Sequence, residues 1–180
     1  MCRKKSTAMQ SIATICSVQN FDADELQAKA KLLLGSYRHV CWSAFGVCQH
    51  DANDSFCVCD IEIQKAINYL YSFPPAEEKD VFERNLQALF DPRWLVELVD
   101  SAMLQVKEFP KTGDKYFTIL SKFYLSKFKF AEPDLLEILQ MERSKYYDLK
   151  KEAVLVFGLA LWGTVLPKIQ SIIDKAPLDA

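Results

Sequence analysis

Apolar residues recur along this chain at intervals of three and four, which is the spacing of one face of an α-helix. Residues 23–45, for example, place Leu26, Leu33 and Val40 near one stripe. The same spacing predicts further helices, which cover residues 61–73, 76–90, 93–109, 115–130 and 133–140, and a last one that begins near Arg143. No segment alternates apolar and polar residues as a strand would. We therefore expect an all-α fold, a helical bundle of six or seven helices.

Residues that begin or end helices separate these segments. Asp91 and Pro92 pair a capping residue with a proline at the first helical position. Residues 110–114 form the clearest turn in the chain. We place a division at this turn: residues 1–110 would form an N-terminal helical region of unknown role. Residues 111–180 would form a helix-turn-helix region with a long apolar last helix.

The segment that starts at Glu132 has the apolar pattern of a helix-turn-helix. Such a motif needs a short helix, a three-residue turn and a second helix held at a fixed angle by buried side chains. The buried positions would be Leu135 and Leu139 in the first helix, Met141 in the turn, and Tyr146 and Leu149 in the second helix.

The outward side of the second helix would then carry groups that suit DNA. The candidate contacts are Arg143, Ser144, Lys145, Tyr147, Lys150 and Lys151. The fork of Arg143 suits a guanine edge or a phosphate, and Ser144 and Lys145 suit phosphates near a helix N-terminus. Further lysines that would support binding to the DNA backbone are Lys122, Lys127 and Lys129.

Some positions depart from the usual motif. Gln140 stands where the turn usually opens with glycine, and Leu136 stands where a small residue usually allows close helix packing. Glu142 and Asp148 would lie near phosphates and cost affinity.

The stretch LLEILQMERSKYYDLKKEAVLVFGLALWG resembles the C-terminal segment of ArpU-like phage and prophage transcriptional regulators. The matching residues are Arg143, Ser144, Tyr146, Tyr147, Lys150, Lys151, Glu152 and Ala153. The likeness covers roughly residues 114–165 and does not extend to the first 110 residues. It implies a helix-turn-helix of the kind by which sigma factors read promoters, in a DNA-binding regulator of a Gram-positive bacterium or its prophage.

The distribution of charge agrees with a nucleic-acid partner for one part of the chain. The formal net charge of the whole is −2, which alone indicates no polyanion. Residues 1–110 carry 11 Lys/Arg and 15 Asp/Glu, whereas residues 111–151 carry 9 Lys/Arg and 6 Asp/Glu. We expect DNA to meet the C-terminal third first.

Other chemistry is weakly indicated. The set Cys48, His50, Cys57 and Cys59 lacks a standard zinc spacing, and a calcium-like loop with Asp51, Asn53, Ser55 and Glu62 has Phe56 where glycine is needed. We interpret the six cysteines as reduced thiols in the cytosol. No nucleophile pattern surrounds the two histidines and no glycine-rich phosphate loop occurs. We therefore expect no metal, no cofactor and no enzyme activity.

Residues 153–167 form an uncharged stretch that must be covered. It is 15 residues long, shorter than the roughly 20 residues of a membrane span. We expect Leu155, Leu159 and Trp162 to form one buried seam, covered by the N-terminal helices or by a second subunit, with Trp162 as a natural interface anchor. This predicts a homodimer and no membrane association. The basic N-terminal residues precede an interrupted apolar run, so we expect no signal peptide and a cytoplasmic location.

Taken together, the sequence predicts a sequence-specific duplex DNA-binding transcriptional regulator that acts as a dimer or alongside RNA polymerase. The alternative is a non-enzymatic helical protein–protein interaction module that uses the helix-turn-helix as a protein-binding surface.

Overall fold

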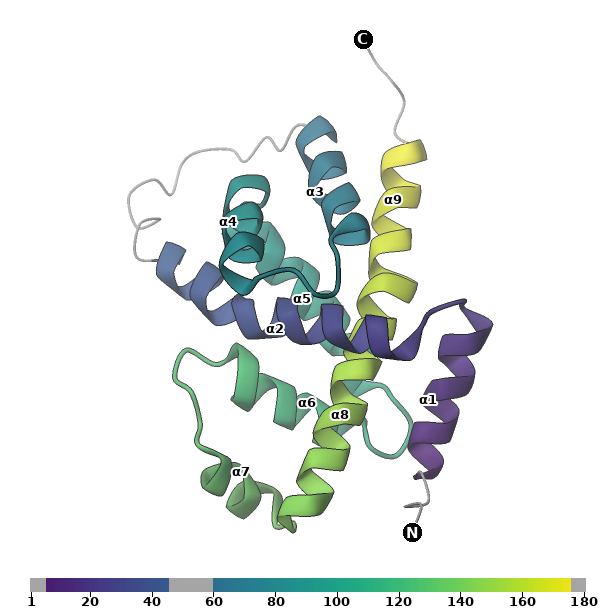
Figure 1. Ribbon diagram of the computed structural model, residues 1–180, viewed down its shortest axis with the longest axis vertical. Coiled ribbons are helices and arrows are strands. Elements are labelled where there is room, and N and C mark those ends of the chain that lie inside the picture. The colour runs from purple at the N-terminus through teal and green to yellow at the C-terminus, as the bar shows by residue number, and fades with distance from the viewer. Residues whose placement is uncertain (1–5, 46–59, 176–180) are drawn as a thin grey trace.

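The computed structural model describes residues 6–45 and 60–175, and these residues are helical without any strand (Figure 1). The α-helices are α1 (Thr7–Val18), α2 (Ala23–Phe45), α3 (Asp60–Ser72), α4 (Lys79–Leu89), α5 (Pro92–Lys107), α6 (Gly113–Leu120), α7 (Glu132–Leu139), α8 (Arg143–Ala160) and α9 (Leu166–Lys175). Two π-helical segments, η2 (Ser121–Leu125) and η3 (Leu161–Val165), extend α6 and join α8 to α9. The predicted all-α class is confirmed.

Side-chain caps explain where several helices begin. Asp91 accepts a hydrogen bond from the backbone N–H of Arg93 at 2.7 Å, and Pro92 occupies the first helical position of α5, as predicted. Ser6 caps α1 by accepting from the N–H of Met9 at 3.0 Å. The helix α1 was not predicted, because its apolar spacing is interrupted by polar residues.

Helix α2 crosses the middle of the molecule, as Figure 1 shows. Helices α3 and α4 lie on one side of it, α6 and α7 lie on the other, and the continuous helix α8–η3–α9 passes across both. At the crossing, a Cβ on Gly158 of α8 would lie 2.8 Å from Cγ of Leu26 in α2. Glycine at this position therefore lets the two long helices approach closely.

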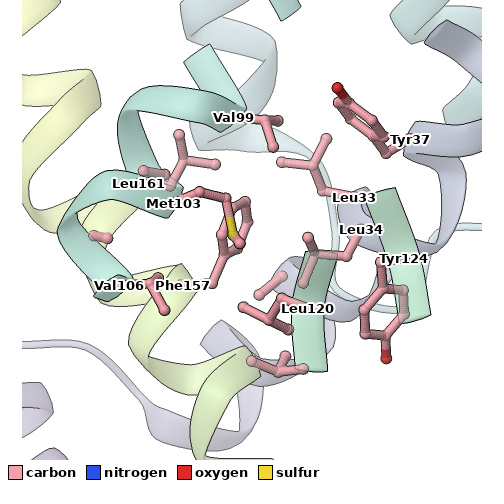
Figure 2. Close-up of a cluster of buried hydrophobic side chains, with 14 of the residues drawn as sticks. Leu33, Leu34, Tyr37, Val99, Met103, Val106, Leu120, Tyr124, Phe157 and Leu161 are labelled. Atoms are coloured by element: carbon pink, nitrogen blue, oxygen red, sulfur yellow. The ribbon is translucent and has the colours of Figure 1, made fainter. Parts of the chain in front are cut away.

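One hydrophobic cluster joins the two halves of the chain. Figure 2 shows Leu33, Leu34 and Tyr37 of α2 facing side chains from α5, α6 and α8 around a shared centre. The hydroxyl of Tyr37 is turned away from that centre. The second half of α8 is fixed in this core. Because α8 is continuous, the core also fixes the direction of its first half.

The apolar stretch near the C-terminus is covered by the chain's own helices. Leu155, Leu159 and Trp162 are 2%, 7% and 4% exposed, which confirms the predicted burial. Their segments pack on α1, α2, α5 and α6. Trp162 donates from Nε1 to the carbonyl of Leu70 at 2.9 Å. Trp162 is therefore a core residue that is covered within this chain, which is the first of the two covers expected for the apolar stretch.

The helix does not end at Pro167, although proline removes a backbone donor and collides with the preceding turn. The π-helical segment η3 ends at Val165, two residues before this proline, and the N–H of Leu166 bonds to the carbonyl of Leu161, five residues earlier. This local widening accommodates the proline, and α9 continues to Lys175.

The continuous helix Arg143–Lys175 is long and apolar enough to cross a membrane by length and composition, with a mean hydropathy of 1.5 in its most apolar window. However, 72% of that window is buried against the rest of the chain. Such a helix is also what the core of a folded domain requires.

Candidate nucleic-acid interface

The predicted three-residue turn separates α7 from α8. Helix α7 ends at Leu139, and Gln140 adopts a left-handed conformation with φ 48° and ψ 50°. The N–H of Met141 bonds to the carbonyl of Leu136 at 3.2 Å, and the N–H of Gln140 bonds to that of Glu137 at 3.1 Å. These two bonds form a Schellman motif, which ends a helix sharply. The left-handed residue explains why glycine is the usual choice at this position.

The burial pattern around the turn follows the prediction. Leu135, Tyr146 and Leu149 are 0%, 1% and 8% exposed, and Leu139 and Met141 are partly buried against the same core. The three buried side chains hold α7 and the first turns of α8 to the body. The other side of these turns is left facing solvent.

The exposed residues on the first half of α8 are Arg143, Ser144, Lys145, Tyr147, Asp148 and Lys151. We call this surface the α8 face. It contains five of the six predicted DNA contacts, and in Figure 1 it belongs to the end of the molecule where α7 meets α8. The first turn of α8 contains no acidic residue, and no side chain caps its N-terminal amides. The N-terminal amides of α8 could therefore donate to an anion, although the carboxylate of the N-cap residue Glu142 opposes a second negative charge at this end.

Glu132 connects two residues of the α8 face to the start of α7. Its Oε1 lies 2.7 Å from Nε of Arg143, and its Oε2 accepts a hydrogen bond from the hydroxyl of Tyr147 at 2.6 Å. A hydrogen bond with Tyr147, followed by the charge of Glu132, raises the pKa of Arg143. Because the Oε1 atom of Glu132 lies against Nε, this ion pair leaves the two terminal nitrogens of the guanidinium on the other side of the group.

Lys150, the sixth predicted contact, faces the protein instead. Its Nζ lies 3.3 Å from the centre of the Phe123 ring and 5.5 Å from that of Tyr124. Burial, and then the charge of nearby Lys31, lower the pKa of Lys150 to about 8. The contact with the Phe123 ring stabilises the ammonium form and opposes that decrease. The structure thus gives Lys150 a packing role beneath the helix.

The segment between α6 and α7 carries lysines interleaved with phenylalanines. Lys122 lies over the ring of Phe130 with 4.6 Å between Nζ and the ring centre. Lys127 and Lys129 are exposed, as is Phe128, at 76%. Two of the three predicted supporting lysines therefore lie on the surface of this segment, which precedes α7.

Helix α2 fixes the start of this segment. The last carbonyls of η2 lack helical partners, and side chains from α2 satisfy them. Arg38 donates from Nε to the carbonyl of Ser126 at 2.9 Å and from Nη2 to that of Phe123 at 2.8 Å, and Trp42 donates to that of Leu125 at 3.0 Å. The lysine-rich segment therefore leaves the body at a defined point.

Sequence reasoning missed Glu132, Phe123 and Arg38. Glu132 was used only as the first residue of the short helix, although its carboxylate contacts two candidate residues across the turn. A carboxylate eleven residues before an arginine is no recognisable spacing. The alternation of Lys and Phe over residues 122–130 was a usable sign that lysine stems would pack on rings.

In residues 6–45 and 60–175, no three His, Cys, Asp or Glu side chains gather as possible metal ligands. The two thiols described, Cys16 and Cys41, are free and buried, and burial raises the pKa of Cys41 to about 12. They are therefore poor nucleophiles. The cysteines and carboxylates considered for zinc and calcium lie outside the described residues, apart from Glu62 in α3.

Comparisons with protein-family models, with curated proteins and with solved structures find no match to this chain.

Proposed function

We propose that this protein is a transcriptional regulator that binds duplex DNA through the α8 face. The observation that supports the proposal is the exposure of one side of the first half of α8, on a helix whose second half is buried in the core. A major groove about 12 Å wide admits one α-helix, provided that the helix projects from its body. Because α8 is rigidly attached to the rest of the protein, the orientation of the protein on DNA would determine how the helix lies in the groove.

The residues of the α8 face would contact different parts of the DNA, according to the chemistry of their side chains. Lys145 and Lys151 would contact phosphates, since an ammonium is a point charge without a fork. Ser144 would do so together with the free amides of the first turn of α8. Arg143 would read a base edge with its two terminal nitrogens while Glu132 holds Nε.

The alternative, a protein-binding surface, has one observation in its favour. Phe128 and Ile138, at 76% and 46% exposed, lie on the segments that precede α8. Exposed apolar side chains of this size suit a protein partner. Both proposals use the same end of the molecule, so a direct binding measurement separates them.

The test is fluorescence anisotropy of a labelled pool of duplex DNA at increasing salt. Because bound lysines displace counterions, affinity should fall steeply with salt, and Lys145→Ala should weaken binding to all sequences and lower the logarithmic salt slope by about 1. Arg143→Ala should cost about 1–3 kcal/mol on a selected site and reduce the preference for that site.

Lys168→Ala is the matched control, because Lys168 is exposed in α9, far along the same continuous helix. It should leave affinity and slope unchanged. Circular dichroism should be the same for all variants, since these side chains are exposed. An absence of DNA binding at about 100 μM protein and low salt, the weak end of non-specific affinity, would contradict the proposal and favour the protein-binding alternative.

A further inference from the structure

A pocket of about 310 Å³ lies between α1, the first turns of α2 and the middle of α8. Its volume is at the lower end of the range of small-molecule sites. None of the predicted functions uses this pocket, although Asp148 and Lys151 of the α8 face stand at its rim.

The inner part of the pocket is apolar. Ile12 of α1 and Leu155 of α8 are buried, at 0% and 2% exposed, and Met9 is partly buried beside them. The small side chains of Ala13 and Ala23 leave the space open between the helices. A short alkyl or aryl group would gain from leaving water for this lining.

A buried carboxylate forms part of the same lining. Glu152 is only 3% exposed. Its Oε1 accepts a hydrogen bond from the hydroxyl of Ser6, and its Oε2 accepts one from Tyr116 at 2.7 Å. Within the described residues no lysine or arginine forms an ion pair with it. Two hydroxyl donors stabilise a carboxylate without neutralising it, and its oxygens keep acceptor capacity.

The charges around the pocket select a cation. Asp24 and Lys151 stand at the rim, so together with the buried Glu152 these three residues place two carboxylates and one ammonium around the pocket. A negative potential in a concave, partly apolar site attracts a positive ligand and disfavours an anion. A neutral molecule of the same shape would bring no positive charge to pair with Glu152.

We propose that this pocket binds a small organic ammonium ion, a primary amine carried on a short apolar body. The ammonium would pair with Glu152 and Asp24, and the apolar body would lie on Ile12 and Leu155. The ligand would fasten α1 to α8. The proposal does not depend on DNA binding and is tested without DNA.

The test is isothermal titration calorimetry of the full chain with 2-phenylethylamine, 2-phenylethanol and 3-phenylpropionate. These probes share a ring and a short linker and differ in charge. The amine should bind at least about tenfold more tightly than the alcohol, because it can form a charge-assisted hydrogen bond in a buried site. The carboxylate should bind with the lowest affinity of the three. Equal binding of amine and alcohol, or no binding of the amine, would overturn the proposal.

Substitutions of pocket residues test whether the probes bind in this pocket. Glu152→Gln keeps the shape and should remove the preference for the amine over the alcohol. Because Glu152 also ties Ser6 to Tyr116, Asp24→Asn at the exposed rim serves as a second variant and should weaken amine binding severalfold. Asp80→Asn is its control, since Asp80 is exposed in the first turn of α4 as Asp24 is in that of α2.

A blocking variant completes the design. Ala13→Phe should fill the pocket from the exposed side of α1 and abolish binding of all three probes. Ala88→Phe, on the exposed side of α4, should bind them as the wild type does. Amine binding that survives Ala13→Phe unchanged would show that the probe binds elsewhere and would contradict the proposal.

Discussion

Glu132 shows how one side chain can set the conformation of two others. Its carboxylate contacts Nε of Arg143 and the hydroxyl of Tyr147, at 2.7 and 2.6 Å, and so joins the first residue of α7 to the first two turns of α8. An exposed pair of this kind contributes little to stability. Its value would lie in orientation, because an arginine held at Nε presents its remaining nitrogens in a limited set of directions.

Replacing Glu132 should therefore separate affinity from specificity. In Glu132→Gln, binding to random duplex DNA should strengthen, because a negative charge near phosphates is lost. The ratio of affinities for the selected and the random duplex should fall several-fold, because Arg143 loses its ionic partner. The measurement is competitive anisotropy with both duplexes at one salt concentration.

Glu137→Gln is the control for this prediction. Glu137 is exposed in the same helix and carries the same charge, but its side chain does not contact Arg143. It should strengthen binding to both duplexes and leave their ratio unchanged. A ratio in Glu132→Gln equal to that in Glu137→Gln would show that Glu132 acts by charge alone.

At the residue level, the sequence predicted which side chains of α8 face outward but not what they contact. Tyr146 and Leu149 were placed correctly as buried, because their spacing follows the helical period. Lys150 was predicted to support binding to the DNA backbone, and in the structure its long stem lays the ammonium on Phe123. A helical period places the Cα of a lysine, whereas the direction of its flexible stem depends on neighbours from other segments.

At the scale of elements, helix boundaries could be predicted where a residue acts locally. Asp91 and Pro92 begin α5, and the Gln140–Glu142 turn separates α7 from α8, as expected. The π-helical segments η2 and η3 were not predicted. Helical periodicity does not reveal the contact of η2 with α2, and it does not show how a helix adjusts before Pro167. The local signal for α1 was too weak, since its stability depends on packing against α8.

Trp162 in η3 offers a test of how two elements are joined. Its Nε1 donates to the carbonyl of Leu70, one of the last carbonyls of α3, and its ring lies 6.3 Å from that of Phe73. Trp162→Ala should lower the free energy of unfolding by about 3–5 kcal/mol, as expected for a buried aromatic.

Trp162→Phe keeps most of the apolar volume and leaves the carbonyl of Leu70 without its donor, so it should cost about 1–3 kcal/mol. Urea denaturation followed by circular dichroism measures both variants. A loss below about 1 kcal/mol for Trp162→Ala would contradict the described packing of η3 on α3.

At the scale of the whole molecule, the sequence was sufficient to predict the all-α architecture and the burial of the apolar stretch. An uncharged run of this length must be buried, and the N-terminal helices were one of the two covers expected. The sequence did not predict how these helices share one core with α6 and α8, because helical periodicity identifies the buried side of a helix and not the helix that packs against it. The pocket between α1, α2 and α8 follows from that arrangement.

The arrangement also places two proposed sites on one helix. Asp148 and Lys151 belong both to the α8 face and to the rim of the pocket, and Glu152 follows them directly. The buried second half of α8 connects this region to the common core. The N-terminal helices would thus serve as the body that holds and positions the α8 face.

The most direct test of the central claim is the mapping of DNA contacts by nuclear magnetic resonance on the uniformly ¹⁵N-labelled chain, whose mass is 20.6 kDa. On titration with a short duplex at low salt, we predict amide shift changes that concentrate in residues 140–151 and in the lysine-containing segment 126–131, and that disappear as salt is raised. Shift changes confined to α3 and α4, or no changes at any concentration of duplex, would contradict the claim that the α8 face binds DNA.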